Sequence, residues 1–107
     1  MKTTLLLIIL LYSCSETQTN RYESKEDVIK DGAIERGWIP EIIPNSSFNI
    51  IETHNLDTNQ IEGSLEYKEI DEPYLEKKLT DMMILEDFKF TIDTNKNYMQ
   101  FKNQKYD

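Results

Sequence analysis

The sequence contains 107 residues, with 12 lysines and arginines against 20 aspartates and glutamates, so its formal net charge is −8. A chain of this length has room for one small domain, and its single cysteine excludes an internal disulfide. The acidic excess disfavours nucleic acid as a partner and would attract a cationic protein, although acidic side chains can also serve solubility alone.

Residues 1–13 have the layout of a secretory signal peptide, because Lys2 precedes an apolar run from Leu5 to Leu11. The run is shorter than the roughly 20 apolar residues that a helix needs to cross a bilayer. The run Leu11-Tyr12-Ser13-Cys14 resembles the lipobox of bacterial lipoproteins.

The lipobox resemblance implies a thioether-linked diacylglycerol on Cys14 and cleavage just before that residue. More than one acyl chain is needed for firm anchoring. The mature protein would then sit on the cell membrane or the outer membrane and face the periplasm or the cell exterior. The alternatives for Cys14 are a buried free thiol and an ordinary signal peptide that is cut elsewhere.

Residues 14–23 are expected to form a flexible tether, since the stretch from Ser15 to Arg21 is polar and lacks aliphatic side chains. Residues 24–107 then form a single domain close to the membrane.

The domain is predicted to begin with a helix. Ser24 is a candidate N-cap, and the helix runs to about Arg36, where Gly37 supplies the stop. Pro40 and Pro44 then preclude a regular helix, so this passage is extended.

Two hairpins are predicted from alternating apolar and polar residues. The first joins strands over 48–54 and 61–68 through the turn 55–59, and the second joins 88–92 to 98–101 through the turn 93–95. Asp-Thr-Asn occurs in both turns, where Asp accepts backbone hydrogen bonds and Asn tolerates a left-handed conformation. We interpret this as one turn solution used twice.

A second helix is predicted between the hairpins. Glu72 and Pro73 open it, and its apolar stripe consists of Leu75, Leu79, Met82 and Met83. The order helix, hairpin, helix, hairpin predicts a two-layer α+β domain, with an antiparallel sheet of about four strands and both helices on one face.

A second resemblance begins at Gly37. The pattern Gly37-Trp38-Ile39-Pro40, Pro44, His54 and Asp57-Thr58-Asn59 is similar to one found in a family of small bacterial exported proteins and lipoproteins, over about residues 30–68. The resemblance implies a type of domain and brings no established activity.

Trp38, His54 and Asp57 are the candidate binding residues. Trp38 is interpreted as a cap on the core, with ligand stacking as the alternative. His54 is the only histidine, and it either bonds the turn backbone or acts as a general base near Asp57.

Catalytic and metal chemistry have weak support in the sequence. Ser46, Ser47 and Ser64 are the serines considered as nucleophiles, and none sits in a Gly-x-Ser-x-Gly elbow. His54, Asp57 and Asn59 match neither a zinc helix nor a calcium loop. We therefore predict no catalytic residue, metal site or cofactor.

These features favour a membrane-anchored, non-enzymatic binding module of the cell envelope. A specific version of this hypothesis is an inhibitor or immunity-like protein that captures a cationic envelope protein. One alternative is a small hydrolase or metal-dependent enzyme centred on His54 and Asp57. Another is a subunit of an envelope complex, which exposed side chains at Trp38 and Ile42 would favour. The sequence does not define the oligomeric state.

Overall fold

The computed structural model describes residues 16–79, 84–85 and 88–103. Cys14, Met82 and Met83 lie outside these residues, so the lipid on Cys14 and the end of the second apolar stripe remain predictions. No helix in the described part of the chain is long and apolar enough to cross a membrane.

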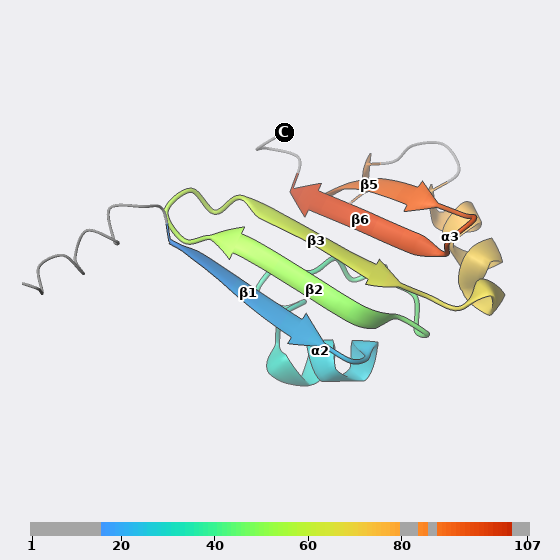
Figure 1. Cartoon of the computed structure of the whole chain (residues 1–107), viewed down its shortest axis with the longest axis horizontal. Helices are drawn as coiled ribbons and strands as arrows, with labels where there is room; N and C mark the ends of the chain where they lie inside the picture. The colour runs from blue at the N-terminus through green and yellow to red at the C-terminus, as the bar shows by residue number, and fades with distance from the viewer. Residues whose placement is uncertain (1–15, 80–83, 86–87, 104–107) are drawn as a thin grey trace, which may run out of the picture.

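The described fold is α+β, as predicted. Its elements are β1 (Thr17–Tyr22), α2 (Lys25–Asp31), β2 (Phe48–Asn55), β3 (Ile61–Glu66), the 3-10 turn η1 (Glu69–Asp71), α3 (Glu72–Leu79), β4 (Ile84–Leu85), β5 (Phe88–Asp93) and β6 (Tyr98–Asn103). The strands form one antiparallel sheet in the order β1-β2-β3-β6-β5-β4 (Figure 1). Five of the strands have six to eight residues and β4 has two, so the expectation of about four strands was too low.

Residues 14–23 were expected to form a flexible tether, but Thr17–Tyr22 form strand β1. Residues Thr17–Tyr22 pair with β2 from Thr17↔Asn55 to Tyr22↔Ile50. The prediction failed because an edge strand with only partly covered side chains needs no apolar alternation, and this one has none. The sheet therefore begins three residues after Cys14.

Both predicted hairpins are confirmed, and β3 pairs with β6 to join them into one sheet. In each turn, the first residue accepts bonds through Oδ1 from the backbone N–H groups two and three residues on; these acceptors are Asn55 and Asp93. The fifth residue is a left-handed asparagine, Asn59 at φ 67° and Asn97 at φ 50°. The turns are therefore equivalent, but Asn55, not Asp57, corresponds to Asp93.

Helix α2 is shorter than predicted. Ser24 is its N-cap, as expected, and its side chain accepts from the Asp27 N–H. Gly32 ends the helix at φ 78°, with its N–H directed to the carbonyls of the last turn. Gly37 also has a positive φ, but it closes a later turn. Two glycines in the sequence could end this helix, and the earlier one, Gly32, does so.

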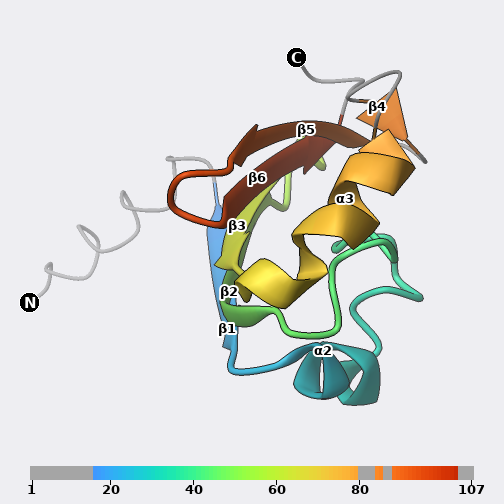
Figure 2. The ribbon, with the colours of Figure 1, turned by 90° about the vertical axis from the view of Figure 1, so that its right-hand side faces the viewer.

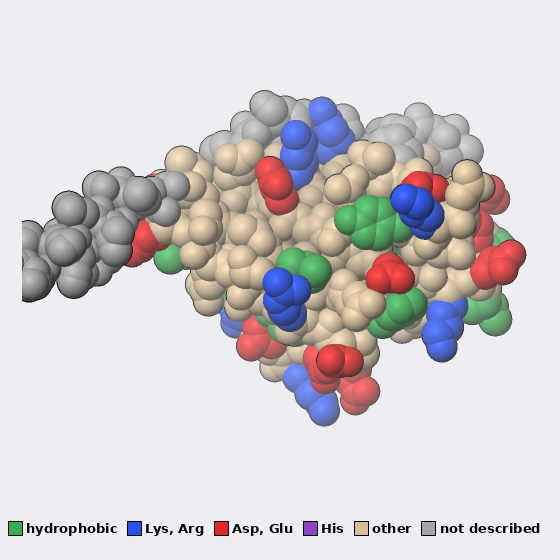
Figure 3. Space-filling view, viewed as in Figure 1, with side chains coloured by type: hydrophobic (Ala, Val, Ile, Leu, Met, Phe, Trp, Pro, Cys, Tyr) green, Lys and Arg blue, Asp and Glu red, His purple; other side chains and the backbone are tan. Residues whose placement is uncertain are grey.

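One face of the sheet carries the second layer. Helix α3 and the segment 32–47 lie over it, with α2 at the end of β1 on the same side (Figure 2). The core lies between the layers, and its buried side chains include Ile39, Ile43, Ile50, Leu65, Leu75, Met99 and Phe101. The opposite face points to the viewer in Figure 3, where charges of both signs are interspersed with single hydrophobic side chains.

Candidate functional site

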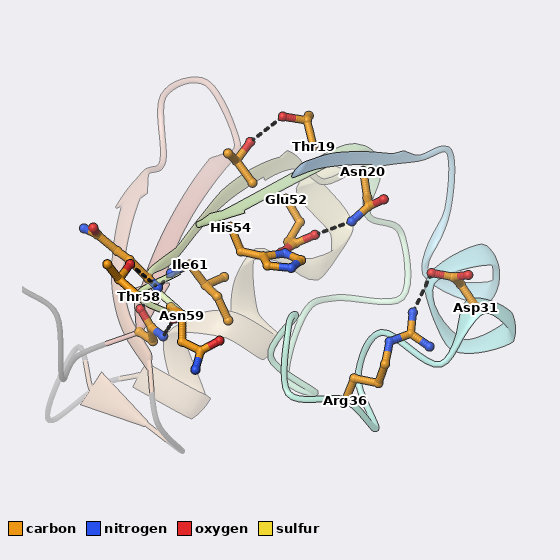
Figure 4. A network of polar contacts seen from close by, with 12 residues as sticks. Thr19, Asn20, Asp31, Arg36, Glu52, His54, Thr58, Asn59 and Ile61 are labelled. Carbon is orange, nitrogen blue, oxygen red and sulfur yellow. Dashed lines mark hydrogen bonds and ion pairs between the residues drawn. The ribbon is translucent and has the colours of Figure 1, made fainter. Parts of the chain in front are cut away.

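A buried polar cluster lies under β1 and β2. Alternation along β2 points Ile50, Glu52 and His54 towards the core, and the Glu52 side chain is fully buried. Glu52 Oε2 lies 2.6 Å from His54 Nδ1, and Glu52 Oε1 accepts from Asn20 Nδ2 at 2.8 Å. Figure 4 shows these three side chains converging beneath the strands. Both carboxylate oxygens therefore have a partner.

The contact with Glu52 orients the imidazole of His54. When Glu52 is ionised its carboxylate can only accept, so Nδ1 is then the donor of this bond and Nε2 carries the lone pair of the neutral ring. Every buried side-chain nitrogen and oxygen in the described residues has a hydrogen-bond partner, and the recorded bond of the ring is the one to Glu52. His54 is only 4% exposed, so its ring lies almost entirely inside the domain.

Aromatic and charged side chains close over His54. The ring of Trp38 lies 4.6 Å from that of His54, and the Arg36 guanidinium lies 4.1 Å from the Trp38 ring. Asp31 accepts from Arg36 Nη2 at 3.0 Å and from the Tyr22 hydroxyl at 2.7 Å. Burial and this bond to Asp31 raise the pKa of Tyr22 above its usual range. The chain of contacts thus connects β2, the segment after α2, α2 itself and β1.

The structure brings two of the three candidate residues together. Trp38 is partly buried against the core, which confirms its capping role, and it stacks on His54. Asp57 is exposed in the turn after β2, where its N–H binds Asn55, so it does not pair with His54. His54 bonds a carboxylate and not the turn backbone. The partner of His54 is Glu52, which the sequence analysis missed although alternation from Ile50 places it on the core face.

Two of the serines considered as nucleophiles, Ser46 and Ser47, form structural hydrogen bonds. Ser47 Oγ donates to the Pro44 carbonyl at 2.6 Å, and Ser46 Oγ accepts from the Lys68 N–H at 2.8 Å. The first bond closes the turn 44–47, and the second connects this turn to the residues that follow β3. Within residues 16–79, 84–85 and 88–103, no group of three or more His, Cys, Asp and Glu side chains could hold a metal ion.

A second polar region lies at the end of the sheet where β5 turns into β6. A depression of about 570 Å³ separates the start of α3 from the β5–β6 turn, and its lining residues are Glu69, Glu72, Pro73, Glu76, Thr94, Asn95 and Asn97. We call it the acidic depression. Glu72 Oε1 accepts from the Tyr67 hydroxyl at 3.0 Å and from Asn97 Nδ2 at 2.9 Å. Burial and the bond to Glu72 raise the pKa of Tyr67 to about 12.

The first of these two regions lies in a segment that matches a known protein family. Residues 16–66 match the family model of the YbbD head domain. The matched segment spans β1, α2, β2 and β3, and so includes Trp38, Glu52 and His54 but neither α3 nor the β5–β6 hairpin. The chain is similar to the YbbD head domain over this segment, which is just under half of its length. No curated protein and no solved structure matches the chain.

Proposed function

We propose that the chain is a membrane-anchored, non-enzymatic binding module of the cell envelope that captures a cationic exported protein, such as a wall hydrolase, in the manner of an inhibitor or immunity protein. Its anchor is a lipid on Cys14, on the cell membrane or the outer membrane. The observation that carries the proposal is the position of the acidic depression. The start of α3 and the β5–β6 turn, which line it, lie at the end of the sheet opposite to the start of β1 (Figure 1).

This placement suits a tethered receptor. The start of β1 is the end nearest to the proposed lipid, so the depression faces away from the bilayer. Glu69 and Glu76 are exposed there, next to the amide groups of Asn95 and Asn97. A surface of one charge sign steers a partner of the opposite sign and speeds its association. The net charge of −8 extends the attraction beyond the contact itself.

The test is capture of basic exported proteins from envelope extracts by the full-length lipidated protein. We expect binding at low salt and release as salt rises, because the screening length falls from about 10 Å at 0.1 M to about 3 Å at 1 M. Replacing Glu69 and Glu76 together with glutamine should weaken capture. The matched control, Asp57→Asn with Glu62→Gln, removes the same charge at the opposite end and should retain capture. Binding that is indifferent to salt, or equally weakened by both pairs, would contradict the proposal.

One observation favours a second candidate, a hydrolase with His54 as general base. The Glu52–His54 contact at 2.6 Å is of the kind that orients the histidine of a catalytic triad. The residue that orients His54 is Glu52, so this candidate enzyme is centred on His54 and Glu52 instead of on His54 and Asp57. Replacing His54 with glutamine discriminates: loss of a measured hydrolytic activity in a variant that retains capture supports the enzyme.

The third alternative, a subunit of an envelope complex, has less support. Exposure of Trp38 and Ile42 would have favoured it, but Ile42 is only 7% exposed and Trp38 is partly buried against the core. Both side chains are therefore used inside the domain.

A further inference from the structure

The position of β1 restricts how the domain can sit on a membrane. If Cys14 carries the lipid, as proposed above, only Ser15 and Glu16 separate it from the first paired residue, Thr17. Three residue steps of extended chain reach roughly 10 Å. The start of β1 is therefore held next to the lipid headgroups, without the ten-residue tether that the sequence suggested.

The β2–β3 turn lies at this same end. The Leu56 N–H donates to the Glu16 carbonyl at 2.8 Å, which ties the turn to the residue that precedes β1. Figure 1 shows the turn beside the start of β1, with α3 and the β5–β6 turn at the far end of the sheet. The Leu56 side chain is 48% exposed. A large aliphatic group thus lies within a few residues of the proposed lipid.

The equivalent β5–β6 turn shows that this leucine is not required by the turn. In both turns the side chain of the first residue accepts the same two backbone hydrogen bonds and the fifth residue is left-handed, yet the second position is Leu56 in one and Thr94 in the other. A single exposed leucine is common on a protein surface. In this protein, however, Leu56 lies beside Glu16, and this position indicates that its side chain contacts the membrane.

We propose that the β2–β3 turn is a second membrane contact, in which Leu56 enters the interfacial layer of the bilayer beside the lipid on Cys14. Two contacts fix an orientation that one flexible anchor cannot. The sheet then stands away from the bilayer along β1, with the carboxylates of Glu16 and Asp57 in the headgroup layer. The acidic depression faces outward, where anionic headgroups repel it least. This inference rests on the proposed lipid anchor.

The test places a fluorescent reporter beside Leu56 without replacing it. Because Cys14 is the only cysteine and is blocked by the lipid, Asp57→Cys can be labelled alone in the full-length protein. The matched control is Asn95→Cys, at the same position of the β5–β6 turn. Both proteins are bound to vesicles of phosphatidylethanolamine and phosphatidylglycerol that contain a lipid-borne quencher.

We expect the label at position 57 to be quenched several-fold more strongly than the label at position 95, and Leu56→Asp to abolish the difference. Thermal unfolding of each variant confirms that it is folded. Equal quenching of the two labels, or quenching that persists in Leu56→Asp, overturns the contact at Leu56.

Flotation of the wild-type protein with the vesicles separates this inference from the proposed anchor. A protein that floats while the label at position 57 stays in water retains its anchor and lacks the turn contact. A protein that does not float, with an unmodified Cys14 by mass spectrometry, overturns both.

Discussion

The two halves of the sheet bury different chemistry. Under β1 and β2, the polar half, the inward side chains include Asn20, Glu52 and His54, joined by hydrogen bonds. Under β3, β6 and β5, the apolar half, the buried side chains are hydrophobic: Ile61, Leu65, Phe88, Phe90, Met99 and Phe101. Both halves belong to one continuous sheet, so the fold does not require the difference.

The difference shows where this chain has residues beyond those needed for packing. Replacing both partners of a buried hydrogen bond with apolar groups of the same shape can be nearly neutral or stabilising. Stability alone therefore explains Glu52 and His54 poorly. It does explain the aromatic residues of the apolar half, which pack in the core. The polar half also lies wholly within residues 16–66, the segment that matches the YbbD head domain.

The largest expected effect comes from breaking the polar half at Glu52. Glu52→Ala leaves His54 and Asn20 without their acceptor inside the domain, and each buried donor left unpaired costs about 1 to 3 kcal/mol. The measurement is the free energy of unfolding from denaturant titration. An effect below about 1 kcal/mol would contradict the burial and bonding described here.

Replacing both partners sharpens this test. Glu52→Met combined with His54→Leu fills the space without polar groups, so we expect it to recover most of the stability that Glu52→Ala loses. If the double variant is as unstable as Glu52→Ala, the pair stabilises the fold more than an apolar core would. Stability would then explain Glu52 and His54, and the contrast between the two halves would not indicate a further role.

The apolar half should instead be sensitive to shape, and Gly63 is the clearest position. A Cβ built on Gly63 would collide with the ring of Phe101 and lie 2.7 Å from the Ile51 carbonyl oxygen. We expect Gly63→Ala to cost about 1 to 3 kcal/mol through overpacking, measured as above. The neighbouring Ser64→Ala, on the open face, should change stability by less than about 0.5 kcal/mol. Equal effects of the two substitutions would show that the Phe101 ring does not cover Gly63.

The sequence predicted the apolar half better than the polar half. Alternation of Phe88 and Phe90 with polar residues defines a strand, and Leu75 and Leu79 define the buried stripe of α3; the structure confirms both. Such patterns work because burial is the signal that they carry. Strand β1 has no such pattern, since it gains its place by backbone pairing at the edge of the sheet.

The candidate site was only half predictable for a related reason. Trp38 and His54 are conspicuous as single residues of their types, and they do stack. Glu52 was missed because a carboxylate is rarely buried, so it was not considered for the core face that Ile50 and His54 define. Asp57 was chosen for its nearness in sequence to His54, but a turn carries the chain away from the face where His54 points.

The smallest expected effect concerns Tyr67, whose hydroxyl donates to Glu72 beside the acidic depression. Tyr67→Phe removes this bond and should cost about 1 kcal/mol at neutral pH. The pKa of Tyr67 is about 12 in the folded protein and about 10 in an unfolded chain, so folding holds the proton more tightly. The stability that this provides is complete below pH 10 and is lost as pH rises to 12.

Stability measured from pH 9 to 12 therefore separates the wild type from Tyr67→Phe. The wild type should lose stability more steeply between pH 10 and 12, so its advantage over Tyr67→Phe should shrink and disappear within this range. Tyr22→Phe is the comparison in the polar half, because the pKa of Tyr22 is raised in the same direction by burial and by Asp31. If Tyr67→Phe leaves the slope unchanged, the hydroxyl does not hold its proton through Glu72, and this wall of the acidic depression is not fixed by that bond.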